Sequence, residues 1–189
     1  MAKNLNKSRI LNSWIIAAIT LAFIIFSKPF FSPESAAHET LDTLGLLLVV
    51  ICSFGRVYTS AFLGGYKNQK LINYGPFSVV RNPLYAFSLL GVLGLSMVTM
   101  QPAVMVVVPI SFLILYHFLI KREETFLKTQ FAAEYEDYTK RVPRLLPNFK
   151  LLHTPEVVEV KPQFIRNAAF DAMWWFIGFW ILETLEQFL

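Results

Sequence analysis

Long apolar stretches alternate with short polar ones along the chain, and this pattern predicts membrane-crossing helices. The apolar runs cover residues 10–26, 41–65, 84–98 and 103–120. A helix needs about 20 mostly apolar residues to cross the hydrocarbon of a bilayer. Four crossings are therefore the simplest arrangement, and the shorter third run could form a tilted or partly inserted hairpin with the fourth. A signal peptide is the alternative interpretation of the first run.

The segment after the fourth run is polar but carries a regular apolar stripe. Apolar side chains recur there at steps of four and three, at Leu127, Phe131, Tyr135, Tyr138 and Val142. This spacing places them on one face of a helix. We expect an amphipathic helix on the cytoplasmic side that lies along the membrane surface or covers the base of the hairpin.

Residues 168–189 are apolar and aromatic but contain Asp171, Glu183 and Glu186. The uncharged stretch between the first two of these acids is too short to span a bilayer alone. We expect a helix half-sunk in the interface or packed on the bundle, with a fifth span as the alternative. The chain is thus predicted to form one structural unit in three parts: N-terminal spans (1–66), the hairpin with its amphipathic helix (67–148), and a C-terminal extension (149–189).

Composition supports an all-α polytopic membrane bundle. Hydrophobic residues make up 55% of the chain and charged residues 16%, whereas soluble domains carry about a quarter charged residues. The single cysteine, Cys52, excludes an internal disulfide framework and a CxxC site, and no metal is expected. No long run of like charge indicates nucleic-acid binding. Basic residues gather in residues 1–9, 66–83 and 121–167, which predicts that these regions face the cytoplasm.

Arg56 lies inside the second apolar run, about two-thirds of the way along. A charged side chain within a span is costly unless it reaches the interface or faces protein. Its position near the basic end favours an arginine that extends to the membrane surface. A buried polar site is the alternative.

The stretch Arg81-Asn82-Pro83-Leu84-Tyr85 opens the hairpin. Asparagine is a favoured N-cap and proline is well tolerated at the first helical position, so we expect Asn82 to cap and Pro83 to begin a helix. A helix N-terminus beside Arg81 would suit a carboxylate or phosphate, with the Tyr85 hydroxyl nearby. The simpler interpretation is a helix start with an arginine and a tyrosine at the interface.

A second polar group follows the fourth run, at His117, Glu123 and Glu124. Seven residues bring a helix back to nearly the same face, so His117 and Glu124 are expected to share one face. Glu124 continues an apolar stripe and should point inward, where it needs a cationic partner such as Arg81, Arg56 or a ligand ammonium. Glu123 is expected to be a solvated charge.

These motifs, GPF…VRNPLY followed by YH…KREE and EYEDYTKRVPRLLP, resemble the isoprenylcysteine carboxyl methyltransferase and phospholipid methyltransferase family across residues 56–147. The family's first motif is Arg-His-Pro-x-Tyr, and Asn82 stands in the place of its histidine. Arg81, Pro83 and Tyr85 match that motif, Glu123 and Glu124 match a later glutamate pair, and His117 matches an upstream histidine.

The resemblance implies an integral membrane enzyme that uses S-adenosylmethionine. It implies that the cofactor is bound by Arg81, Asn82, Pro83, Tyr85, His117, Glu123 and Glu124, with Arg81, Glu124 and His117 in catalytic roles. The methyl acceptor would be lipid-borne, either a prenylcysteine-like carboxylate or a phospholipid amine. A glycine-rich strand–turn–helix is missing, which excludes a soluble Rossmann-type methyltransferase. The competing hypothesis is a non-catalytic transporter subunit or assembly protein.

Overall fold

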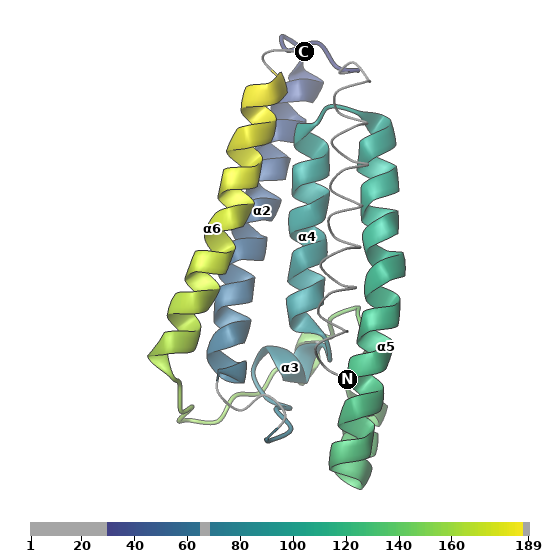
Figure 1. Cartoon of the computed structure of the whole chain (residues 1–189), viewed down its shortest axis with the longest axis vertical. Coiled ribbons are helices and arrows are strands. Elements are labelled where there is room, and N and C mark those ends of the chain that lie inside the picture. Colours follow the sequence, from purple (N-terminus) through teal and green to yellow (C-terminus); the bar gives the residue numbers. More distant parts are fainter. Residues whose placement is uncertain (1–29, 65–68, 187–189) are drawn as a thin grey trace, which may run out of the picture.

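The computed structural model describes residues 30–64 and 69–186 (Figure 1). The first predicted span, residues 10–26, lies outside the described residues. The described part is helical and contains no strand. Its elements in chain order are α2 (Ala36–Leu63), α3 (Pro76–Val79), α4 (Pro83–Val98), α5 (Pro102–Arg141), the 3₁₀ turn η1 (Phe149–Leu151) and α6 (Pro162–Glu186).

Four long helices run side by side in this bundle, with α2 packed against both α4 and α6 (Figure 1). The contact between α2 and α4 is close because both helices carry glycine there. A Cβ atom added at Gly94 would lie 2.6 Å from the carbonyl oxygen of Gly45. Small residues let helix backbones approach each other in this way in a bilayer, where packing rather than water exclusion holds helices together.

The membrane prediction is confirmed for this part of the chain. Two helices, Ala36–Leu63 and Pro102–Arg141, are long and apolar enough to cross a bilayer, and α4 is a shorter apolar helix. Large apolar side chains on α5, including Val106, Ile110 and Ile114, are exposed. Such a surface suits lipid rather than water. The chain therefore forms a helical membrane bundle.

The fourth apolar run and the amphipathic stripe were expected as separate helices, but both belong to the 40-residue helix α5. Residues 121–131 contain Lys, Arg, Glu, Leu and Gln, which are good helix formers, and no Gly or Pro to end the helix. A break in helical geometry occurs only later, at Ala132, where φ is 41° and ψ is −114°. The stripe therefore continues from the span after a kink.

The C-terminal helix α6 packs on the bundle, which was one of the two expected arrangements. Phe179 is buried in a cluster with Val49 of α2 and Val98 of α4, while Trp174 and Trp180 stay exposed. The helix begins at Pro162, six residues before the apolar stretch, because proline is favoured in the first turn.

Polar side chains join the start of α2 to the end of α6, at the end of the bundle opposite the hairpin opening (Figure 1). The His38 imidazole lies 2.6 Å from a Glu186 carboxylate oxygen and 3.8 Å from one of Asp42. Glu183 brings a third carboxylate oxygen within 4.8 Å of those of Asp42 and Glu186. A protonated His38 would offset part of this negative charge.

We predict that Gly94→Ala lowers the thermal unfolding midpoint in detergent by about 3 °C or more, because its methyl group would push the Gly45 backbone away. Gly178→Ala is the matched control, since a Cβ there meets only a Leu95 side chain at 3.5 Å. Unfolding can be followed with a thiol-reactive dye, because Cys52 is the single cysteine and is buried. Equal midpoints for the two variants would contradict the close-packing argument.

Candidate cofactor site at the base of the hairpin

The segment before α4 is held in place by the segment after α5. Tyr138, on the last turns of α5, donates its hydroxyl to the carbonyl oxygen of Phe77 at 2.7 Å. Three backbone hydrogen bonds also join the two segments. The N–H groups of Gly75, Arg81 and Asn148 donate to the carbonyl oxygens of His153 (2.8 Å), Pro143 (2.9 Å) and Val79 (3.0 Å), respectively. We call residues 143–153 the strap, because they run along residues 75–81.

The amphipathic stripe of α5 packs against the same region. Tyr135, Tyr138 and Val142 form a buried cluster with Leu71, and Leu127 and Phe131 pack against it. All five stripe residues therefore contribute to this cluster. Of the two placements expected for the stripe, the structure has the one at the base of the hairpin.

The start of α4 differs from the predicted cap. Pro83 opens the helix and Asn82 occupies the N-cap position, but the Asn82 side chain forms no capping hydrogen bond. Its amide nitrogen instead lies 3.3 Å from a Glu124 oxygen and 3.2 Å from the Arg144 carbonyl oxygen. The interaction with a charged group replaces the local cap, since hydrogen bonds to charged groups are the stronger ones.

The anion-binding capacity expected of this helix end is also reduced. Pro83 has no N–H group, and the N–H of Tyr85 already donates to the Asn82 carbonyl oxygen at 3.1 Å. Positive charge at the site therefore comes mainly from side chains.

An arginine lies on each side of the Glu124 carboxylate. Arg81 Nη1 is 3.3 Å from one oxygen and Arg144 Nε is 3.1 Å from the other. The three side chains are mostly buried, with exposed fractions of 17% for Arg81, 17% for Glu124 and 27% for Arg144. Arg81 was one of three cationic partners considered for Glu124, and the structure pairs these two residues. With two guanidinium groups and one carboxylate, this cluster carries a net positive charge.

Two buried polar atoms at this cluster are not fully satisfied within the described residues. The Arg81 Nε and the Tyr135 hydroxyl form no well-directed hydrogen bond there, although the hydroxyl lies beside the Arg81 guanidinium. Burying such groups without a partner is costly, so a ligand that reached them would recover that cost. The cluster thus has both charge and hydrogen-bonding capacity for a further anionic group.

Glu123 was expected in solvent, but the structure places it against α4. The Tyr85 hydroxyl donates to a Glu123 carboxylate oxygen at 2.8 Å. The Tyr85 ring packs edge-on against Tyr116, with ring centroids 5.1 Å apart, and Tyr116 stacks on Phe112. This aromatic contact aligns α4 with one face of α5 and brings the hydroxyl to Glu123.

His117 is the predicted site residue that the structure does not bring into the cluster. Its side chain is exposed, and its ring meets that of Phe118 edge-on, with centroids 5.7 Å apart. Within the described part of the chain it forms no hydrogen bond or ion pair. Its role in cofactor binding or catalysis stays a prediction.

Of the two interpretations given for Arg56, the structure has the polar site and not an arginine that extends to the membrane surface. Arg56 pairs with Asp171 of α6 and donates to the Ser88 hydroxyl of α4 at 2.5 Å. Its guanidinium also lies 6.0 Å from the centre of the Trp175 ring. Arg56 therefore forms a polar contact between three helices and is not the partner of Glu124.

Sequence reasoning missed Arg144. The residue lies beyond the stripe, in the stretch RVPRLLP at the end of the family-like motif, and was given no role in the site. The sequence feature that could have indicated this residue was its basic side chain directly after the amphipathic stripe. The strap brings it back to the carboxylate.

Comparison with known proteins matches part of the segment that builds this site. The family model for phospholipid methyltransferases matches residues 43–134, which include the α4 motif and the glutamate pair. Residues 43–134 belong to the phospholipid methyltransferase family. Arg144, the strap and α6 lie outside the segment matched by this family model. No solved structure matches the chain.

Two bacterial proteins that are similar to this chain are named as metal resistance proteins. The chain is 31% identical over 182 residues to the cobalt-zinc-cadmium resistance protein CzcN of Cupriavidus metallidurans, covering 95% of this chain and 80% of the relative. It is 30% identical over 148 residues to the nickel-cobalt-cadmium resistance protein NccN of Alcaligenes xylosoxydans xylosoxydans, covering 78% and 68%.

A plant relative carries the name of an enzyme. The chain is 30% identical over 128 residues to a probable protein-S-isoprenylcysteine O-methyltransferase of Oryza sativa, covering 61% of this chain and 65% of the relative.

We predict that Glu124→Gln destabilises the protein by about 3 kcal/mol, because two mostly buried guanidinium groups would lose their counter-charge. Glu123→Gln should cost about 1 kcal/mol or less, since an amide oxygen can still accept from Tyr85. Chemical denaturation in detergent micelles measures both. A larger effect from Glu123→Gln would mean that the Tyr85 contact, rather than the arginine pair, holds α4 against α5.

Proposed function

We propose that this protein is an integral membrane methyltransferase that transfers a methyl group from S-adenosylmethionine to a lipid-borne acceptor at the cytoplasmic boundary of the membrane. The observation that carries the proposal is the cluster of Arg81, Glu124 and Arg144 at the opening of the α4–α5 hairpin. Arg81 and Glu124 belong to the segment that the methyltransferase family model matches.

The residues present fit the polar groups of this cofactor. Its amino-acid end carries a carboxylate and an ammonium, and its ribose carries a diol. The net positive charge of the cluster suits the carboxylate, because arginine binds carboxylates in a bidentate geometry. The buried Tyr135 hydroxyl and Arg81 Nε offer further donors. Glu124 and Glu123 suit the ammonium or the diol, so Arg81, Arg144, Glu123 and Glu124 would hold this end of the molecule.

The cofactor, when bound, supplies an electrophilic methyl group on a good leaving group. The protein must then align donor and acceptor and keep water away. A prenylcysteine-like carboxylate is already a nucleophile at neutral pH, whereas a phospholipid amine must first lose a proton. Glu124 and His117 are the candidates for orienting the acceptor or taking that proton, and Arg81 would position the cofactor.

The charges at the two ends of the bundle support the proposed orientation. The end that holds the cluster also carries Lys70, Arg141 and Lys150. The other end carries the carboxylates beside His38. Basic residues favour the cytoplasmic side, where S-adenosylmethionine would be available.

Binding of S-adenosylhomocysteine to the purified protein, measured by calorimetry, tests the proposal. We expect Arg81→Ala to weaken binding at least about tenfold, because a charge-assisted contact of this kind contributes about 1.5–3 kcal/mol. Glu136→Gln is the control, since this exposed carboxylate lies elsewhere on α5. Asn82→His should retain binding, because the family motif has histidine at this position. A folded wild-type protein that gives no heat would contradict the proposal.

A second proposal concerns the biological setting. We propose that the activity serves resistance to divalent metals, because the similarity to the CzcN resistance protein extends over 95% of the chain. A deletion strain should grow less well than its parent in cobalt, zinc or cadmium, and the wild-type gene should restore growth where Arg81→Ala does not. Equal restoration by an Arg81→Ala protein that no longer binds S-adenosylhomocysteine would instead favour a non-catalytic assembly or transporter role.

A further inference from the structure

The backbone of α5 is strained at Ala132. Its φ of 41° and ψ of −114° lie in a region that L side chains rarely adopt and that glycine adopts without a steric clash. Ala132 and its neighbour Ala133 are both exposed, and alanine is the residue that most favours a regular helix. The local sequence therefore favours a straight helix here, and contacts elsewhere in the molecule impose the kink.

These contacts lie after the kink and build the cofactor site. The Tyr138 hydroxyl donates to the Phe77 carbonyl oxygen, and Arg144 pairs with Glu124. A straight helix would place Arg141 about 25 Å beyond Glu124 along the axis, and the three residues from Arg141 to Arg144 span at most about 11 Å. Arg144 could not then reach Glu124, so the site is complete only when α5 is bent.

We call residues 133–153 the flap, which comprises the last turns of α5 and the strap. The flap supplies Arg144 and the Tyr135 hydroxyl to the site, whereas Arg81 and Glu124 come from the rest of the bundle. None of residues 143–153 is buried, and backbone hydrogen bonds and the Arg144 pair hold this strap in place. Segments with few buried contacts open at a small free-energy cost.

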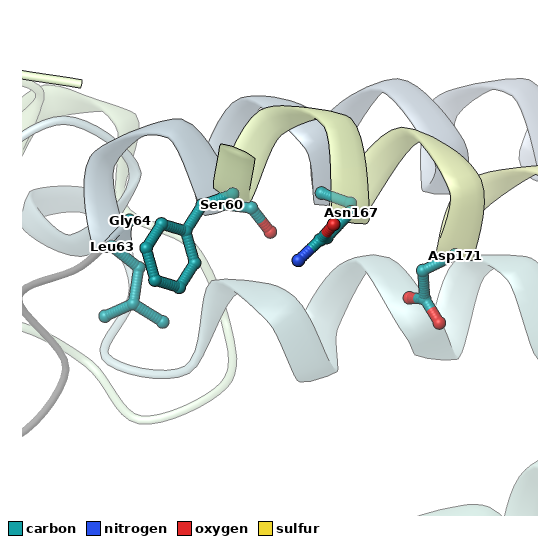
Figure 2. Close-up of a pocket in the computed structure, with 7 residues that line it drawn as sticks. Ser60, Leu63, Gly64, Asn167 and Asp171 are labelled. Atoms are coloured by element: carbon teal, nitrogen blue, oxygen red, sulfur yellow. The ribbon is translucent and has the colours of Figure 1, made fainter. Parts of the chain in front are cut away.

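Access to the cluster of Arg81, Glu124 and Arg144 depends on this flap. The three side chains are mostly buried in the bent form. A groove of about 390 Å³ between α2 and α6 opens beside Asn167 and Asp171 (Figure 2), but none of the three cluster residues lines it. The groove therefore gives no route to the cluster, and the flap is the cover that would have to move.

We propose that the flap swings about Ala132, opens the cluster to the cofactor and closes over the cofactor once it is bound. In the open form Ala132 returns to helical geometry, which relieves the backbone strain. A ligand that contacts both Arg81 in the bundle and Arg144 on the flap favours the closed form. The identity of that ligand rests on the cofactor binding proposed above. Ala132 is thus a positioning residue, which acts through the side chains of the flap.

Amide-resolved hydrogen exchange of the ligand-free, full-length protein in detergent tests the proposal. The N–H groups of Arg81 and Asn148 donate across the junction that opens. Ala132→Val should speed their exchange at least about fivefold, because a β-branched side chain fits a helix better than a positive φ. Ala133→Val, the same change at a helical position, should not. The amide of Val49, in the buried core, should stay unchanged in both variants.

Two further measurements complete the test. Ala132→Gly should slow the exchange of the same two amides, since glycine adopts the kink without strain and disfavours the straight helix. In the wild-type protein, S-adenosylhomocysteine at about 100 times its Kd should slow their exchange at least about tenfold.

Equal exchange in Ala132→Val and Ala133→Val, or faster exchange in Ala132→Gly, would overturn the proposal. Calorimetry with S-adenosylhomocysteine on the same preparations separates this result from failure of the methyl-transfer proposal. If the homocysteine compound binds and the exchange rates do not respond to the variants, only the flap is wrong. If the rates respond as expected and the wild-type protein gives no heat, the flap moves about Ala132 and the assignment of its ligand is wrong.

Discussion

Two contacts fix the position of Arg81, one through its backbone and one through its side chain, and the rest of the site depends on them. The backbone N–H of Arg81 donates to the Pro143 carbonyl oxygen, and its side chain pairs with Glu124. The first contact comes from the strap and the second from α5, so the residue is fixed by two segments that lie far from it in sequence. Because Arg81 directly precedes the start of α4, the same contacts fix where that helix enters the bundle.

Much of the fold could be predicted from local sequence. Pro83 begins a helix at the expected position because proline fits the first helical turn. The stripe from Leu127 to Val142 was recognised from its spacing alone, and the structure uses all of it. The junction of the stripe with the preceding span was missed, because the change from apolar to charged residues at Lys121 marks the end of an apolar run but does not end the helix.

The parts that escaped prediction depend on contacts between distant residues. Arg56 and Asp171 are 115 positions apart. The energetic cost of placing an arginine in a membrane span predicts that it needs a polar partner, but it does not predict which residue that partner is. Asn82 has the sequence of an N-cap, but a carboxylate within reach gives its amide a stronger acceptor. Arg144 returns to Glu124 only because the strap folds back along residues 75–81.

The unequal lengths of α4 and α5 have a consequence for the surrounding bilayer. At 1.5 Å per residue the 16 residues of α4 rise about 24 Å, and the 40 residues of α5 extend about 60 Å before allowing for the kink. The hydrocarbon layer is about 30 Å thick. The rise of α4 is thus about 6 Å less than that thickness, so a thinner bilayer around the start of α4 would let an aqueous molecule and an acyl chain reach Arg81 and Tyr85 together.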